Sequence, residues 1–189
     1  METTAQARAT ADLLDEAVAQ IDGSLRLPDI ETLAGWLAER LLQLNPHTGR
    51  DLLTAVAEAD RESRRTGEGV VLAQAASGHV MVVRFFPEGQ PTPIHGHGGW
   101  GAVAVLAGRG RYETWQPVSD GLAELTAARE LGPGDTLAWP NPPDDVHRQV
   151  GVVGGTTEVT IFARHPFFTW APQFQPASVA AGADVQPNA

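Results

Sequence analysis

Between residues 70 and 163, glycine and proline divide the sequence into short segments rich in β-branched and aromatic residues. Short segments separated by regularly spaced turns are typical of β-strands in a sandwich or a small barrel, whereas a parallel βαβ sheet needs a helix between successive strands. The expected strands are residues 70–73, 79–86, 101–106, 111–116, 122–129, 136–139, 147–153 and 157–163. The sequence therefore predicts a mainly β fold.

The first 66 residues have a different pattern, with apolar residues at helical spacing. We expect helices at residues 9–21, 28–44 and about 50–64, because their apolar residues recur every three or four positions and the second begins at a proline. After residue 170 the chain consists mostly of Ala, Gly, Pro and Gln, which have little to bury. The predicted organisation is N-terminal helices packing on the barrel (residues 1–66), a β-barrel (67–170) and a disordered tail (171–189).

Composition excludes several classes of function. The net charge of −10, without a local cluster of basic residues, argues against nucleic-acid binding. The chain has no cysteine, so neither a disulfide nor a thiolate nucleophile is available. No apolar run approaches the roughly 18 residues of a membrane helix, and the first residues do not resemble a signal peptide. We therefore expect one cytoplasmic domain without a membrane segment.

Three histidines form a candidate metal site. His95 and His97 are two residues apart, and residues i and i+2 of an extended strand point to the same face. His147 follows a proline-rich loop about fifty residues later and is the expected third ligand. Three neutral imidazoles suit Fe, Zn, Ni or Cu and leave the 2+ charge of the ion uncompensated, which favours an anionic substrate.

The histidine stretch resembles the cupin family. Its first motif is matched at Gly89, His95, His97 and Gly108, and the position of the family's metal-binding glutamate is Gly101. The second motif is matched loosely, at Gly134, Pro142 and His147, with Gly151 where asparagine is usual. This resemblance implies a cupin double-stranded β-helix, a jelly-roll barrel, preceded by the N-terminal helical segment.

A ligand set of three histidines without the glutamate resembles that of the three-histidine branch of cupins, typified by cysteine dioxygenase and related thiol dioxygenases. This resemblance implies a non-haem Fe(II) dioxygenase that takes O2 and a small-molecule substrate and oxidises a thiol to a sulfinate. The chain departs from that branch at two places. The family's Ser-His-Tyr set aligns with Val159, Ile161 and Ala163, and its substrate-binding arginine aligns with Gly69 or Val70.

Two further residues are candidates for catalysis. Arg84 interrupts a strand pattern that should be buried, where it would bind an anionic substrate or form a structural ion pair. Tyr112, the only tyrosine, could supply an acid near the metal, although the pattern favours a packing or edge position. We expect Asp144 and Asp145 in a solvated turn, with support of a histidine ligand as the alternative. Three tryptophans would line the cavity or pack in the core: Trp100, Trp115 and Trp139.

Three alternatives remain open. The same site could act on a diketone or another small organic acid, or the protein could be a non-enzymatic cupin that binds a metal or a small ligand. A Zn- or Mn-dependent isomerase is less favoured, because such enzymes usually need the missing carboxylate. Fe(II) is the expected metal, with Zn, Ni or Mn as alternatives, and a homodimer is possible for a barrel with exposed edge strands.

Overall fold

The computed structural model describes residues 30–37, 50–75, 78–163 and 173–177. Residues 30–37 are helical. The further elements are α3 (Arg50–Thr66), β1 (Val70–Gln74), β2 (Val80–Phe86), β3 (Ile94–His95), β4 (Gly101–Ser119), β5 (Leu122–Leu131), β6 (Thr136–Trp139), β7 (His147–Phe162) and β8 (Gln173–Pro176). The expected helix at residues 9–21 lies outside the described residues. No helix among those described is long and apolar enough to cross a bilayer.

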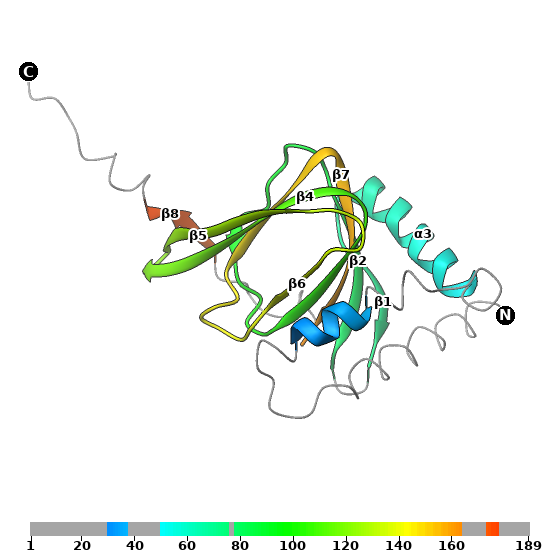
Figure 1. Cartoon of the computed structure of the whole chain (residues 1–189), viewed down its shortest axis with the longest axis horizontal. Helices are drawn as coiled ribbons and strands as arrows, with labels where there is room; N and C mark the ends of the chain where they lie inside the picture. The colour runs from blue at the N-terminus through cyan, green and yellow to red at the C-terminus, as the bar shows by residue number, and fades with distance from the viewer. Residues whose placement is uncertain (1–29, 38–49, 76–77, 164–172, 178–189) are drawn as a thin grey trace, which may run out of the picture.

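The strands form a closed barrel around β4 and β7, the two longest strands, which pair antiparallel along most of their length. β7 also pairs with β2 and β3, and β4 also pairs with β5 and β6. β8 lies between β3 and β5, so the hydrogen-bonded order β7-β3-β8-β5-β4 returns to β7. Figure 1 shows these strands arranged in a ring, with α3 on one side of it. The mainly β barrel with a helical segment before it is confirmed.

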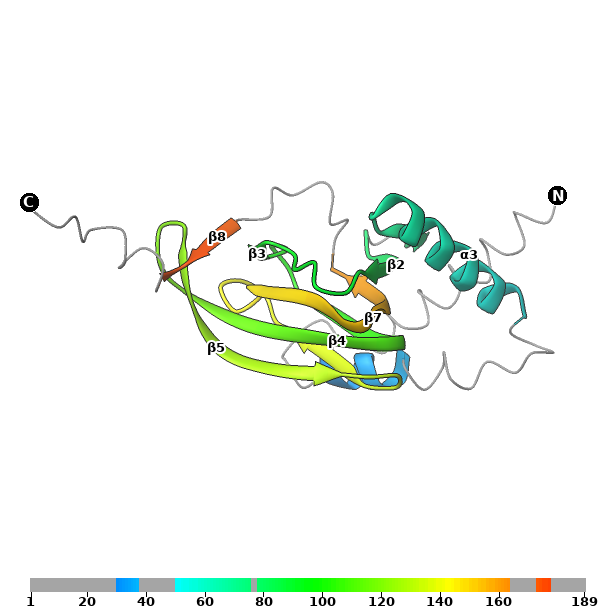
Figure 2. The same cartoon turned by 90° about the horizontal axis from the view of Figure 1, so that it is seen from above.

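The sequence predicts four separate strands where the structure has only β4 and β7. The glycines that were expected to end strands instead bend them: Gly108 in β4 has a φ of 76°, and Gly154 and Gly155 in β7 have φ of 80° and 81°. The β4–β7 register also shifts on both sides of Gly108. Bulges of this kind turn a strand without ending its pairing. Figure 2 shows the resulting curvature of β4 and of its partner β5.

Alternate residues of the strands enter two different apolar clusters, as expected when both faces of a sheet are covered. In β2, Val80 and Val82 point into the barrel, whereas Met81 and Val83 point towards the helices. The cluster inside the barrel consists of Val80, Val82, Val103, Val105, Tyr112, Leu131, Leu137, Trp139 and Phe162. The cluster between the barrel and the helices includes Ile30, Leu33, Leu37, Val56, Ala59, Trp100, Val159 and Ile161.

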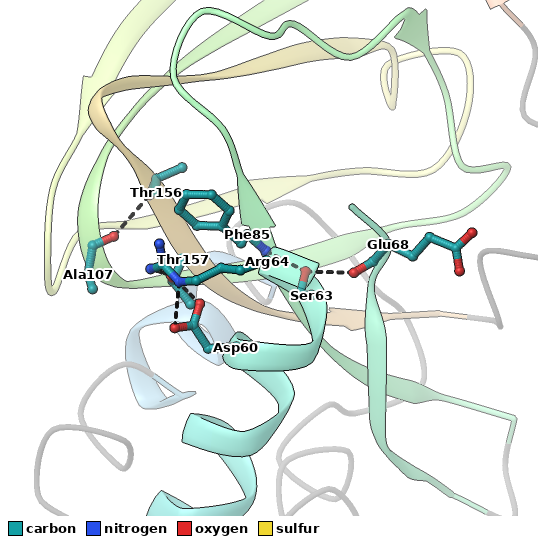
Figure 3. Close-up of polar contacts among 8 residues, drawn as sticks. All are labelled: Asp60, Ser63, Arg64, Glu68, Phe85, Ala107, Thr156 and Thr157. Carbon is teal, nitrogen blue, oxygen red and sulfur yellow. Dashed lines mark hydrogen bonds and ion pairs between the residues drawn. The ribbon is translucent and has the colours of Figure 1, made fainter. Parts of the chain in front are cut away.

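Polar contacts also hold the C-terminal half of α3 against β2 and β7 (Figure 3). Arg64 Nε lies 2.9 Å from Asp60 Oδ2, and Arg64 Nη2 donates to Thr157 Oγ1 at 3.0 Å. The Thr157 hydroxyl in turn donates to Asp60 Oδ1 at 2.7 Å, and the Ser63 hydroxyl accepts the Phe85 backbone N–H at 2.8 Å. The helix therefore buries an apolar face and satisfies polar groups at its edge.

The C-terminal region differs from the sequence-based expectation. Residues 173–176 form β8, whereas the sequence predicts disorder from residue 171 onwards. Phe174 packs on a small cluster that contains Ile94 and Trp115, and this apolar contact together with the backbone pairing explains why the segment is ordered. For these four residues the disorder prediction is corrected. Residues 178–189 lie outside the described part of the chain.

Candidate metal centre

The three predicted ligands lie together at one end of the barrel. His95 in β3 is the register partner of His147 in β7, and His97 follows β3. The ring centroids are 4.8 Å apart for His95 and His97, 4.7 Å for His95 and His147, and 5.0 Å for His97 and His147. One nitrogen from each ring lies within 4.8 Å of the others. Because a metal–imidazole bond is about 2 Å long, one ion can bind all three rings with a small closure of the cluster.

Hydrogen bonds and burial prepare these rings to bind a cation. His95 Nδ1 lies 2.8 Å from the Pro93 carbonyl oxygen, and His147 Nδ1 lies 2.8 Å from the Asp145 carbonyl oxygen. Each Nδ1–H is therefore a donor, and the Nε2 lone pair is left for the metal. Burial lowers the pKa of all three histidines, that of His97 to about 3. The imidazoles are consequently neutral at neutral pH, the form in which histidine binds metals.

Asp145 connects the two segments that carry the histidines. Its side chain is only 2% exposed, and its Oδ2 accepts the backbone N–H groups of His97 and Gly98, both at 2.7 Å. The solvated turn expected from the sequence is therefore found at Asp144 but not at Asp145. A Cβ at Gly96 would lie 2.8 Å from Asp145 Oδ2, so the absence of a side chain there allows this close approach.

Substitution of Asp145 by alanine is expected to weaken metal binding without touching a ligand. The variant would leave the half-buried N–H groups of His97 and Gly98 unpaired, at a cost of about 1–3 kcal/mol each. Loss of such outer contacts typically weakens metal affinity about 10- to 100-fold. Metal titration would measure the change, with the exposed Asp144→Ala as the control. Unchanged affinity in Asp145→Ala would show that other contacts hold His97.

Trp139 fills the space beside Gly101, the position that aligns by sequence resemblance with the cupin glutamate. A Cβ at Gly101 would lie 2.0 Å from Cζ2 of Trp139, so position 101 cannot carry a side chain beside this indole. The indole stacks on His97 at 5.3 Å between centroids, and its centroid is 4.7 Å from that of His147. Within the described residues, the only ligand cluster is therefore a set of three imidazoles.

A pocket of about 50 Å³ opens onto the histidines, room for a few water molecules or one very small compound. Arg84 lines this pocket, as its predicted role in binding an anionic substrate requires. Tyr112 does not line the pocket; its ring stacks on His147 at 5.0 Å, and its buried hydroxyl has no hydrogen-bond partner within the described residues. The pocket is lined by Gly69, Val82, Arg84, Phe86, Thr92, His95, His97, Trp139, His147, Gln149, Thr160 and Phe162.

The structure adds a polar pair that the sequence analysis missed. Glu158 is 1% exposed inside the barrel, and Gln149 donates its Nε2–H to Glu158 Oε2. Burial raises the pKa of Glu158 to about 7, despite the opposing effects of this hydrogen bond and of Arg84. Alternation puts Glu158 on the same face of β7 as Thr160, which lines the pocket, but it does not say which face points inwards, so the sequence alone could not identify Glu158.

Two of the positions that align by resemblance with the Ser-His-Tyr set face away from the histidines. Val159 and Ile161 belong to the cluster that faces the helices, so neither can reach the metal site. The residues of β7 that point into the barrel are one position earlier, at Glu158, Thr160 and Phe162. Of the three tryptophans, Trp139 lines the pocket, whereas Trp100 packs against the helices and Trp115 packs near β8.

Comparison with known proteins gives similarity of fold only. No protein-family model matches the chain, and no characterised protein has a similar sequence. A double-stranded β-helix protein from Klebsiella pneumoniae is 19% identical over 64% of this chain and 94% of that chain, with a TM-score of 0.46. The DMSP lyase DddQ from Ruegeria pomeroyi is 19% identical over 80% of each chain, with a TM-score of 0.47. The hydroquinone 1,2-dioxygenase PnpCD is 12% identical over 60% of this chain and 70% of that chain, with a TM-score of 0.45.

Proposed function

We propose that this protein is a non-haem Fe(II) dioxygenase that oxidises a small thiol to a sulfinate. The observation that carries the proposal is the convergence of three neutral imidazoles, without a carboxylate, on a small pocket inside the barrel. This donor set fits Fe(II) as well as Zn, Ni or Cu. The assignment to the cysteine dioxygenase-like branch of cupins is part of the proposal and stays a prediction.

The reaction balances without a further reductant, because a thiol and O2 together contain all the atoms of a sulfinic acid. When bound, the iron supplies the redox chemistry between O2 and sulfur. The chain contributes the three neutral ligands and an aromatic wall, made by Phe86, Trp139 and Phe162, that would shield a bound substrate from water. Excluding water strengthens electrostatic interactions inside the site.

Arg84 and Tyr112 have different places in this proposal. Arg84 lines the pocket, and its guanidinium lies 5.0 Å from the centroid of the Phe86 ring, so it can contact a substrate. Tyr112 contacts His147 rather than the pocket. We therefore assign to Tyr112 the role of holding the His147 ring in position, in place of an acid that meets substrate.

A second candidate activity is oxidative cleavage of a diketone or another small organic acid at the same metal. The presence of a cation beside the histidines favours it, because Arg84 can bind the oxygen atoms of such a substrate as well as those of a mercapto acid.

Oxygen consumption by the iron-loaded protein tests the proposal. Small thiols should give uptake of one O2 per sulfinate formed, and His97→Ala should abolish it. His79→Ala is the control, because His79 is a half-buried residue that packs on Trp100 and does not line the pocket. Uptake with diketones and not with thiols would favour the second candidate. Full occupancy by zinc or nickel without turnover on either class would refute the dioxygenase proposal.

A further inference from the structure

Arg84 and Glu158 face each other inside the barrel without forming an ion pair. They are register partners on the neighbouring strands β2 and β7, so their side chains leave the same face of the sheet. Within the described residues, the Arg84 guanidinium makes no hydrogen bond or ion pair, and it lies 5.0 Å from the centroid of the Phe86 ring. A half-buried guanidinium with five N–H donors and no acceptor is costly, which points to a missing anionic partner.

Glu158 does not fill that role, because Gln149 holds one of its oxygens. The other oxygen, Oε1, is buried and has no hydrogen-bond partner within the described part of the chain. Glu158 and Arg84 nevertheless affect each other electrostatically, since each appears among the charges that shift the other's pKa. Glu68 is a second carboxylate that raises the pKa of Arg84, so the charge of Glu158 is one of two that affect how strongly Arg84 attracts a third group.

We propose that Arg84 anchors a small carboxylate in the pocket and that Glu158 competes with it, so that the carboxylate binds more tightly when Glu158 carries a proton. Arg84 and the three histidines line the same pocket, so one small molecule can contact the guanidinium and the metal site together. That this carboxylate is the substrate rests on the proposed function. The substrate class is then a short carboxylic acid with a second group that contacts the metal.

The groups around Glu158 allow the pH dependence to be assigned. From β2 it faces Arg84, from β4 Tyr112, and on β7 it accepts the hydrogen bond of Gln149. Burial raises the pKa of Tyr112 far above its ordinary value, so the tyrosine does not titrate near neutral pH. Burial raises the pKa of Glu158 to about 7 in the protein without metal, so proton loss from it should weaken carboxylate binding between about pH 6 and about pH 8, by up to about tenfold if the two carboxylates exclude each other.

Acetate binding to the metal-loaded protein, measured by calorimetry and by thermal shift, tests this inference. Wild type should bind acetate more weakly, by up to about tenfold, at about pH 8 than at about pH 6, as the linkage requires. Glu158→Gln should bind acetate with the same affinity at both pH values, and at least as tightly as wild type does at the lower pH. Arg84→Met, which keeps the apolar stem, should bind at neither. The exposed ion pair Arg109–Glu130 provides controls of equal charge change, Arg109→Met and Glu130→Gln, which should behave as wild type.

Several results would overturn the inference. Acetate affinity that is absent in wild type, or constant between the two pH values, would refute it without any variant. Binding that survives in Arg84→Met would place the anion on the metal, and a pH dependence retained in Glu158→Gln would exclude Glu158 as the competitor. If Glu158→Gln does not fold, Glu158→Met offers a neutral side chain of similar length. Because these are binding measurements, failure of thiol oxidation with this pattern intact would refute only the proposed function.

Discussion

His147→Ala is expected to lose most of the bound metal and all of the oxygen uptake. His147 is the most buried of the three ligands, 2% exposed, and its Nδ1 is fixed by the Asp145 carbonyl so that Nε2 is left for the ion. Loss of an outer contact alone typically weakens a metal site about 10- to 100-fold, so removal of a ligand should cost at least about 100-fold in affinity. Metal content after dialysis and the rise in melting temperature on adding Fe(II) or Zn(II) would both report the loss.

His79→Ala is the matched control, because it removes an imidazole outside the cluster. It should keep the metal content and the metal-dependent rise in melting temperature. His147→Ala also leaves a cavity beside Tyr112 and Trp139, so circular dichroism must first show that the variant is folded. A folded His147→Ala protein with full metal occupancy would show that the third ligand is another residue.

Gly101→Ala is expected to have the largest effect on stability. The new methyl group would overlap the Trp139 ring, with 2.0 Å between the Cβ and Cζ2, and residue 101 is paired on both sides, with Trp139 and with Phe162. Neither backbone nor indole can move far in a closed barrel, so the cost should reach or exceed the roughly 1–3 kcal/mol typical of overpacking. Denaturant unfolding would measure the change in the free energy of unfolding.

Trp139→Leu should relieve this clash, so the cost of Gly101→Ala should be much smaller in the Trp139→Leu background. A double-mutant cycle measures that coupling between the two positions. Gly132→Ala is the control, because a Cβ there would meet its nearest atom at 3.9 Å, and its effect should stay within about 0.5 kcal/mol. Strictly additive costs at positions 101 and 139 would mean that the indole does not exclude a side chain at position 101.

The sequence predicted several features correctly because they depend on short-range rules. Alternation and turn residues are properties of neighbouring positions, and they indicated the mainly β barrel and the helix that buries Ile30, Leu33 and Leu37. The separation of two residues between His95 and His97 also predicted correctly that their rings lie close together. Strand ends were less predictable, because a glycine that ends a strand and a glycine that bends one, such as Gly108, look alike until the strand's partner is known.

By itself, the sequence determined the fold class and named the three histidines that the structure brings together. Only the tertiary structure decided what surrounds them: the indole of Trp139 against Gly101, the Asp145 carboxylate between two chain segments, and Glu158 opposite Arg84. The physical reason is that each of these contacts joins residues about 40 to 75 positions apart, and it depends on strand register. A shift of one residue in register would turn Glu158 outwards and Val159 inwards, and local sequence patterns do not specify that choice.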